Sequence, residues 1–337
     1  MTDIIIPAYN AHDTLFRALC SIGDYPCHIT IVDDCSDLGY DSIIQRFDGI
    51  KSISVIRTPS QIGPGAARQL GVDSTSGDFI VFLDADDTFA SPYALYMMEL
   101  AISESEDYGM LTSKHSDDNM NVDKNGNCVW LKSQCVSADN NRLHGKMYRR
   151  AFLEKYSLRF SSAQSDCNED ISFNKLIRML SKQKYKNSGV VTIRQLDEVT
   201  ANWRLKSESI CRRNDCEFYY NQSNMGLAKN MLYVIEEARR LKICKEIITE
   251  EVLTVMMFMY QSYICTLNVR PEFADNSFAG CKLFYQNAFK KLKNDINPKQ
   301  FLDSYNQMMV EAYTNSSFNS SINVLNIIEF LNLLDED

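Results

Sequence analysis

Three short apolar segments near the start of the chain each end in polar residues, and this pattern constrains the fold more than any other feature. They are residues 4–6, 28–32 and 79–83. Their length and their turn-like flanks are typical of strands buried on both faces of a parallel sheet. Helix-compatible segments at 14–22 and 42–47 lie between strands. The resulting βαβα order predicts an α/β fold.

The third of these strands ends in Asp84-Ala85-Asp86-Asp87. Open α/β sheets bind ligands at the carboxyl ends of their strands, and one or two carboxylates can hold a cation that also contacts phosphate. No basic residue lies near Asp84 and Asp86 in the sequence, so we expect a cation to neutralise them. An aspartate-rich turn without a ligand remains an alternative, because aspartate forms local hydrogen bonds in turns.

The glycine-containing segment at residues 63–65 (Gly-Pro-Gly) is not a dinucleotide-binding loop. Arg68 stands where a third glycine would be needed, and no Gly-Lys-Ser/Thr sequence makes a phosphate-binding loop. We interpret the segment as a turn followed by a helix. Arg68 on that helix would project toward a nucleotide or the aspartate cluster, or would pair with Asp33 or Asp34.

Seven motifs follow one another along the chain in a specific order. They are residues 6–10 (Ile-Pro-Ala-Tyr-Asn), 32–36 (Val-Asp-Asp-Cys-Ser), 61–71 (Gln-Ile-Gly-Pro-Gly-Ala-Ala-Arg-Gln-Leu-Gly), 82–87 (Phe-Leu-Asp-Ala-Asp-Asp), 145–153, 158–160 and 169–173. In this order and spacing the chain resembles family 2 glycosyltransferases over roughly residues 3–210. The resemblance implies a GT-A-type (Rossmann-like) fold, with a mixed, mostly parallel sheet and flanking helices.

The resemblance implies a role for each motif at a donor site. Tyr9 would offer a flat face to a pyrimidine, and Asp34 would accept a hydrogen bond from the base or the ribose. Asp84 and Asp86 would share Mn²⁺ or Mg²⁺, which neutralises the leaving diphosphate, while Asp87 would be a structural cap. The implied donor-nucleotide-binding residues are Pro7, Tyr9, Asn10, Asp34, Arg68, Asp84 and Arg204.

On the acceptor side, the resemblance places the base of an inverting transfer at Asp170. Asn168 is the predicted N-cap of a helix over 171–180, with Glu169 and Asp170 in its first turn. Acidic residues are common there because they complement the helix dipole, which would also lower the pKa of Asp170. Glu169 and Lys146 are the other implied acceptor-side residues.

Residues 113–141 are polar and predict exposed loops with a hairpin turn. Two of the four histidines of the chain, His115 and His144, lie within or just after this segment. Either could supply a further metal ligand, although a lone histidine is more often structural.

The charge of the chain is unevenly distributed. The net charge is −9, yet residues 140–215 carry 16 basic against 8 acidic residues. This basic segment is either a solvated face or a site for an anionic substrate. Net acidity argues against indiscriminate nucleic-acid binding, but a local patch can still contact phosphates. The residues considered for anion binding are Arg142, Lys146, Arg149, Arg150, Arg204, Arg212 and Arg213.

From residue 215 onward, the apolar spacing is helical. We therefore predict two domains, a GT-A-type catalytic domain over 1–212 and a helical domain over 213–337. The apolar face of the last helix would dock on the body of the protein or mediate homo-oligomerisation. The predicted helices span 226–241, 245–267, 278–294, 298–313 and 321–334.

Composition indicates a cytoplasmic protein without a transmembrane segment. The longest apolar stretch, 252–267, contains three polar residues and is shorter than the ~20 residues that a membrane span needs. No basic leader precedes an apolar segment at the N-terminus. Eleven scattered cysteines without C-x-x-C spacing are best explained as reduced thiols.

Taken together, the resemblance implies a metal-dependent inverting glycosyltransferase that moves a sugar from a nucleotide-sugar donor, expected to be UDP-linked, to a hydroxyl of a glycan or glycoconjugate. Hydroxymethylated bases in DNA are a second acceptor class. Two further functions to weigh are those of a nucleotidyltransferase and of an inactive sugar-nucleotide-binding relative. The first usually opens with a glycine-rich basic loop, which this chain lacks, and the second is expected to lose Asp86 or Asp170, which are both present.

Overall fold

The computed structural model describes residues 1–117, 120–122, 128–130, 134–161, 169–204, 224–269 and 274–296, together with 299, 303, 332 and 334. The chain forms two compact units. One comprises Met1–Gln164 and Glu169–Arg212, and the other comprises Ser165–Asn168 and Arg213–Asp337.

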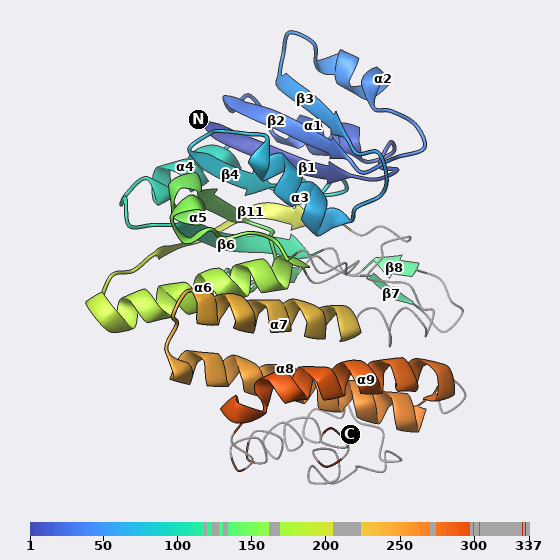
Figure 1. The fold of residues 1–337 in the computed structure, drawn as a ribbon. Helices are drawn as coiled ribbons and strands as arrows, with labels where there is room; N and C mark the ends of the chain where they lie inside the picture. The colour runs from blue at the N-terminus through green and yellow to red at the C-terminus, as the bar shows by residue number, and fades with distance from the viewer. Residues whose placement is uncertain are drawn as a thin grey trace. The chain divides into compact units, whose positions relative to one another are not determined.

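The first unit is built on one large mixed sheet, shown in Figure 1. Its strands are β1 (Thr2–Ala8), β2 (Cys27–Asp33), β3 (Ser52–Arg57), β4 (Phe79–Phe82), β5 (Thr88–Phe89), β6 (Met110–Asp117), β9 (Gln134–Val136), β10 (Lys146–Arg149) and β11 (Ile193–Trp203). Their order is β3-β2-β1-β4-β10-β6-β11-β5, with β9 paired to β6. A separate antiparallel pair consists of β7 (Met120–Val122) and β8 (Cys128–Trp130).

Most neighbouring strands in the first half of this sheet are parallel. β1 pairs in parallel with β2 and β4, and β2 pairs in parallel with β3. β10 runs antiparallel between β4 and β6, and β11 continues in parallel with β6. The predicted strands correspond to β1, β2 and β4. The predicted mixed, mostly parallel sheet with flanking helices is confirmed, whereas the remaining strands were not predicted.

Helices cover both faces of the sheet. They are α1 (Leu15–Ser21), α2 (Asp41–Ile44), the 3-10 helix η1 (Gln45–Phe47), α3 (Pro64–Asp73), α4 (Ala94–Ile102), α5 (Arg150–Tyr156) and α6 (Glu169–Ser188). Because side chains alternate along a strand, Ile4 and Ile6 of β1 point to one face and Ile5 to the other. Ile5 contacts Gly71, where α3 passes so close that a Cβ would not fit.

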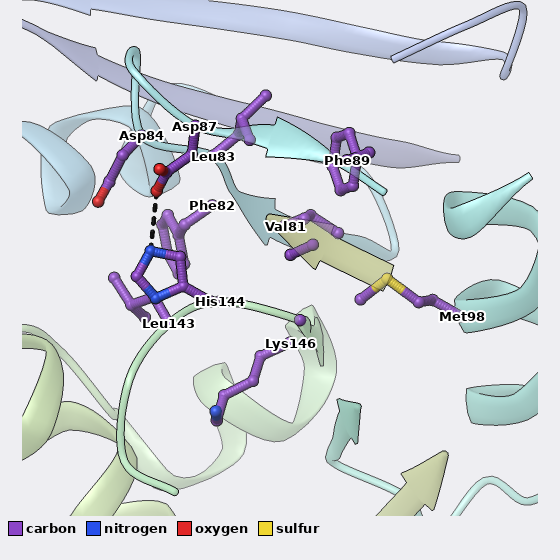
Figure 2. A pocket seen from close by; sticks show the side chains of 12 residues that line it. Val81, Phe82, Leu83, Asp84, Asp87, Phe89, Met98, Leu143, His144 and Lys146 are labelled. Carbon is purple, nitrogen blue, oxygen red and sulfur yellow. Dashed lines mark hydrogen bonds and ion pairs between the residues drawn. The ribbon is translucent and has the colours of Figure 1, made fainter. Parts of the chain in front are cut away.

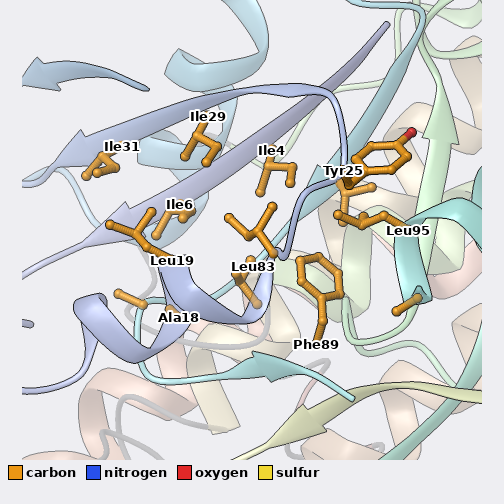
Figure 3. Packing of buried hydrophobic residues seen from close by; sticks show 14 of the residues in the cluster. Ile4, Ile6, Ala18, Leu19, Tyr25, Ile29, Ile31, Leu83, Phe89 and Leu95 are labelled. Atoms are coloured by element: carbon orange, nitrogen blue, oxygen red, sulfur yellow. The ribbon is translucent and has the colours of Figure 1, made fainter. Parts of the chain in front are cut away.

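The main hydrophobic core lies on the face of Ile4 and Ile6, as Figure 3 shows. Their side chains and those of Ile29 and Ile31 are completely buried, together with Leu19 of α1. Each such side chain contributes about 1.5–3 kcal/mol when fully removed from water. This packing fixes β1 and β2, and with them the position of their carboxyl ends.

The opposite face carries an aromatic cluster of Phe82, Tyr148, Phe160 and Phe173. Phe173 belongs to α6, and its ring stacks on Phe160 with 4.2 Å between centroids. Phe82 is the last residue of β4 and Tyr148 lies in β10. The cluster therefore holds the first turns of α6 against the end of β4.

The second unit is helical over its described residues. Its helices are α7 (Asn224–Arg240), α8 (Lys245–Val269), α9 (Ala274–Leu292) and the 3-10 helix η5 (Lys293–Asp295). α7 packs on α8, and α8 packs on α9. They correspond to the first three helices predicted in this region, whereas the predicted helices over 298–313 and 321–334 lie almost entirely outside the described residues. Among the described helices, none is both long and apolar enough to cross a membrane.

Candidate functional site

Parallel pairing brings the carboxyl ends of three strands to one edge of the sheet, and the candidate site begins there. β1 ends at Ala8, beside Asp33 at the end of β2, and β4 ends on the other side of β1. After β4 the chain turns, and the Asp87 N–H donates to the main-chain oxygen of Asp84 (3.0 Å). The turn leaves Asp84 about one-third exposed and buries Asp87. The two carboxylates therefore meet different surroundings.

Arg68 connects Asp84 to the acidic start of α6. Its Nη2 donates to Asp84 Oδ1 at 2.5 Å, and its Nη1 donates to Glu169 Oε1. Burial raises the pKa of Asp84, but Arg68 and then His144 outweigh that effect and hold its pKa below the usual value. Arg68 thus projects toward the aspartate cluster, one of the placements that the sequence left open, and it partly neutralises Asp84 although no basic residue is near Asp84 in the sequence.

The alternative pairing of Arg68 with Asp33 or Asp34 is wrong, because both aspartates have other partners. Asp33 Oδ2 accepts a hydrogen bond from Arg57 Nη1 at 2.7 Å. Asp34 is buried, and its two oxygens accept from the main-chain N–H groups of Ile62 (2.7 Å) and Gly63 (2.9 Å). In this structure the Asp34 carboxylate therefore holds the loop that leads into α3.

Asp87 and His144 form the second half of the site, which Figure 2 shows. His144 Nε2 lies 2.8 Å from Asp87 Oδ2. Burial lowers the pKa of His144, but Asp87 and Asp84 more than compensate, so its pKa lies above the usual value. Ligand atoms of Asp84, Asp87 and His144 lie within 4.8 Å of one another. These three side chains could hold one metal ion.

The chemistry of this group fits a divalent cation. Carboxylate oxygens suit Mg²⁺ and Mn²⁺, and imidazole is a common ligand of transition metals. Asp84, Asp87 and His144 also line a pocket of about 10 Å³, roughly the volume that one water molecule needs. Among the described residues, buried His144 Nδ1 has no hydrogen-bond partner.

Asp86 lies outside this group. It is half-buried, and its main-chain oxygen accepts a hydrogen bond from Arg17 Nη2 at 2.8 Å. Asp87 instead faces inward, where its second oxygen accepts from the Arg204 N–H at 2.7 Å. The structure thus brings Asp84 together with Asp87 and His144, whereas the sequence pairs Asp84 with Asp86.

The first turn of α6 presents Glu169 and Asp170 to the same site. Asp170 Oδ1 accepts a hydrogen bond from the Ile171 N–H at 2.8 Å. Burial raises the pKa of Asp170 despite the opposing charges of Arg68 and His144. The expectation that the helix N-terminus lowers this pKa is wrong, because burial outweighs the dipole. The predicted N-cap, Asn168, lies outside the described residues.

Glu169 packs tightly against the start of α3. A Cβ added at Gly65 would lie 2.8 Å from Glu169 Cγ and 3.1 Å from its Cβ. Burial raises the pKa of Glu169, and Arg68 opposes that effect. Gly65 is therefore required by the close approach of two segments that are distant in the sequence.

We expect Gly65→Ala to destabilise the protein by about 1–3 kcal/mol, because the extra methyl group overpacks a buried contact. Thermal and urea denaturation measure this loss. Ala66→Ser is the matched control, since Ala66 lies on the same helix but is exposed. Equal stability of the two variants would contradict the contact.

The other predicted donor-side residues lie at the carboxyl end of β1 and in the loop that follows it. Pro7 lies in β1, and the Tyr9 ring is 49% exposed, so it is free to contact a ligand. Asn10 has a positive φ of 48°. Its Nδ2 donates a hydrogen bond to Asp37 Oδ2 (3.0 Å), and its Oδ1 accepts one from the Asp37 N–H (2.9 Å). The Asn10–Asp37 pair therefore fixes the loop that presents Tyr9.

Two arginines of the basic segment, Arg149 and Arg150, have structural partners. The Arg149 guanidinium donates to the main-chain oxygens of Tyr108, Ile102 and Ser105. Arg150 pairs with buried Asp3 at 2.9 Å. These two arginines are therefore not available to phosphates, contrary to one interpretation of the sequence. Arg212 and Arg213 lie outside the described residues.

Lys146 is completely buried, and its Nζ donates to Asn140 Oδ1 at 3.2 Å. Burial lowers its pKa to about 7, assisted by Arg178.

The Arg142 guanidinium donates a hydrogen bond to Asp117 Oδ2 at 2.7 Å and lies over the Trp203 ring. His115 is buried and stacks on His144, with 5.2 Å between ring centroids. Among the described residues, His115 does not belong to the group of Asp84, Asp87 and His144.

Comparison with known proteins gives one family match. Residues 3–161 match the sequence model described as "Glycosyl transferase family 2". An uncharacterised glycosyltransferase of Haemophilus influenzae is 35% identical over 95 residues, which is 27% of this chain and 38% of that protein. The chain thus spans about two fifths of the length of this curated relative.

Two solved structures share the fold. Residues 1–349 of TarS from Staphylococcus aureus, in complex with UDP-GlcNAc, match at a TM-score of 0.60 with 18% identity, over 88% of this chain and 82% of that chain. The mannosyltransferase PcManGT from Pyrobaculum calidifontis, in complex with GDP-Man and Mn²⁺, matches at 0.52 with 12% identity, over 95% and 87%. The predicted GT-A-type fold is confirmed.

Proposed function

Residues 3–161 belong to glycosyl transferase family 2, and on this premise we propose that the chain is a metal-dependent inverting glycosyltransferase. It transfers a sugar from a nucleotide-sugar donor, UDP-linked, to a hydroxyl of a glycan or glycoconjugate. The binding of UDP-GlcNAc by TarS and of GDP-Man with Mn²⁺ by PcManGT supports the donor class and the cation.

One observation carries this proposal. Asp84, Asp87 and His144 converge at the carboxyl edge of the sheet, and the charges of Asp84 and His144 act directly on Asp170. A cation-binding group and a half-buried carboxylate of raised pKa thus lie close together. A donor diphosphate and an acceptor hydroxyl require these two components.

The reaction needs a base on one face of the sugar and a stabilised leaving group on the other. A cation held by Asp84, Asp87 and His144 would act as a Lewis acid on the departing diphosphate oxygen. Asp170 accepts the proton of the acceptor hydroxyl while that oxygen bonds the anomeric carbon, and the bond from this carbon to the diphosphate breaks. The raised pKa of Asp170 makes it a stronger base.

Arg68 keeps this arrangement fixed. Because it bonds both Asp84 and Glu169, it sets the separation between the strand-end turn and the helix that carries Asp170. Such pre-organisation lowers the barrier, since little reorientation is then needed in the transition state. The structural partners of Arg149 and Arg150 leave fewer basic side chains for a DNA acceptor, which makes a glycan acceptor our preferred class. The presence of Asp170 argues against an inactive relative.

Ligand-induced thermal shifts test the proposal. We expect UDP with Mn²⁺ to stabilise the protein by about 3 kcal/mol at a hundredfold excess over the dissociation constant, because the ligand binds only the folded state. The shift should shrink in EDTA. A panel of nucleotide sugars, incubated without acceptor, should then show metal-dependent hydrolysis of the true donor. Identical UDP shifts in Mn²⁺ and EDTA would contradict the metal, and no shift with any nucleotide would contradict the function.

A further inference from the structure

His144 lies in a segment without helix or strand, residues 137–145 between β9 and β10, which we call the His144 loop. A metal ligand in such a loop needs external support, because its own backbone has no ladder of hydrogen bonds. The support comes from α6, the helix that carries Asp170 in its first turn.

Asn174 makes the central contact. Its side chain is completely buried, and its Nδ2 donates to the main-chain oxygens of Asn141 (2.9 Å) and Arg142 (3.3 Å) in the loop. The same Nδ2 lies 3.2 Å from the main-chain oxygen of Asp170, one turn earlier in α6. One amide thus contacts both the backbone of the proposed base and the His144 loop.

The other end of the Asn174 amide is anchored in the sheet. Its Oδ1 accepts a hydrogen bond from the Tyr148 hydroxyl at 2.8 Å, and Tyr148 is fully buried in β10. This bond gives the amide oxygen a partner in the sheet, while Nδ2 contacts the three carbonyl oxygens.

Arg178, one turn further along α6, forms a second contact with the same loop. Its Nη2 donates to the Asn140 main-chain oxygen at 2.8 Å, and its Nη1 pairs with Asp139 at 2.5 Å. Two residues on consecutive turns of α6 therefore hold the loop along one face of the helix.

We propose that Asn174 is a positioning residue that couples the helix of Asp170 to the His144 loop. The metal part of this inference rests on the proposed function, whereas the mechanical coupling does not. Removal of a group that orients a metal ligand typically lowers metal affinity or activity by 10- to 100-fold. A buried carbonyl that loses its partner also carries a desolvation penalty, which favours opening of the loop.

Two variants separate this role from simple stability. Asn174→Ala removes the contacts of this side chain to the loop, whereas Tyr148→Phe removes only the bond to Oδ1 and leaves the three Nδ2 contacts in place. Both variants delete the buried hydrogen bond between the Tyr148 hydroxyl and Asn174 Oδ1, so they share its loss of stability. Hydrogen exchange of residues 138–145 in the metal-free protein is the first readout, and Mn²⁺ binding by calorimetry is the second.

We expect Asn174→Ala to accelerate exchange in the loop and to weaken Mn²⁺ binding, each by about 10-fold or more, while Tyr148→Phe changes both by less than about threefold. If Asn174→Ala does not fold, Arg178→Met should shift both readouts in the same direction, since it releases the loop from a partly exposed position. Equal exchange in the Asn174 variant (or its substitute) and the Tyr148 variant overturns the positioning role. Wild-type protein that binds neither Mn²⁺ nor a nucleotide overturns the proposed function instead.

Discussion

Asp170→Asn should reduce sugar transfer by about 10²- to 10⁴-fold, because it removes proton acceptance and preserves shape. The Asn Oδ1 can still accept the hydrogen bond from the Ile171 N–H, so the start of α6 should remain intact. The affinity for UDP should hardly change. Steady-state kinetics and UDP titration of the same protein preparations provide the measurement, with exposed Asp107→Asn as the matched control.

The pH dependence gives an independent check of the same role. Burial places the pKa of Asp170 above its ordinary value, which is about 3.9 for aspartate. As the pH falls through this raised pKa, the carboxylate becomes protonated and can no longer accept the hydroxyl proton. The acid limb of kcat/KM should therefore lie above about pH 4 in the wild type and disappear in Asp170→Asn. If Asp170→Asn lowered the affinity for UDP as strongly as the rate of sugar transfer, Asp170 would be a structural cap instead of a base.

The second large effect concerns the cation. Asp84→Asn should abolish metal-dependent activity, because Asp84 belongs to the ligand group on both the sequence-based and the structure-based assignment. We further expect Asp87→Asn and His144→Gln to raise the Mn²⁺ concentration for half-maximal activity by about 10- to 100-fold. Asp86→Asn serves as the comparison, since it changes one carboxylate in the same turn.

Metal titrations of these four variants decide between the two assignments. Near-wild-type titration of Asp86→Asn would place the ion at Asp84, Asp87 and His144. The opposite outcome, with a strong effect of Asp86→Asn and none of His144→Gln, would restore the pairing of Asp84 with Asp86 that the sequence predicts.

The strands with a local sequence signature were predicted, whereas a strand that depends on distant partners was not. β1, β2 and β4 are continuous apolar segments followed by turn residues, so their length and flanks identify them. β10 has only four residues, begins with a buried lysine, and forms only because β4 and β6 provide partners on both sides. Nothing within residues 146–149 distinguishes it from the start of a helix.

The same reasoning explains which parts of the site were predictable. Asp84 and Asp170 stand at the ends of recognisable elements, so the sequence could single out both as candidates. Arg68 contacts Glu169 across 101 positions of sequence, and His144 contacts Asp87 across 57. Pairs at such separations leave no periodic signal. The pKa of Asp170 was predicted in the wrong direction because the dipole is local, whereas burial depends on the whole fold.

The central place of β10 has a consequence for the order of assembly during synthesis. Until residue 149 has left the ribosome, the apolar strand β4 is an unpaired sheet edge, and such edges readily pair with other chains. Asp87 follows β4 and His144 precedes β10, so the insertion of β10 closes the edge and also joins the two halves of the cation-binding group. Closure of this edge and assembly of the cation-binding group are therefore a single event, and a chain that has not yet inserted β10 would be an aggregation-prone intermediate without that group.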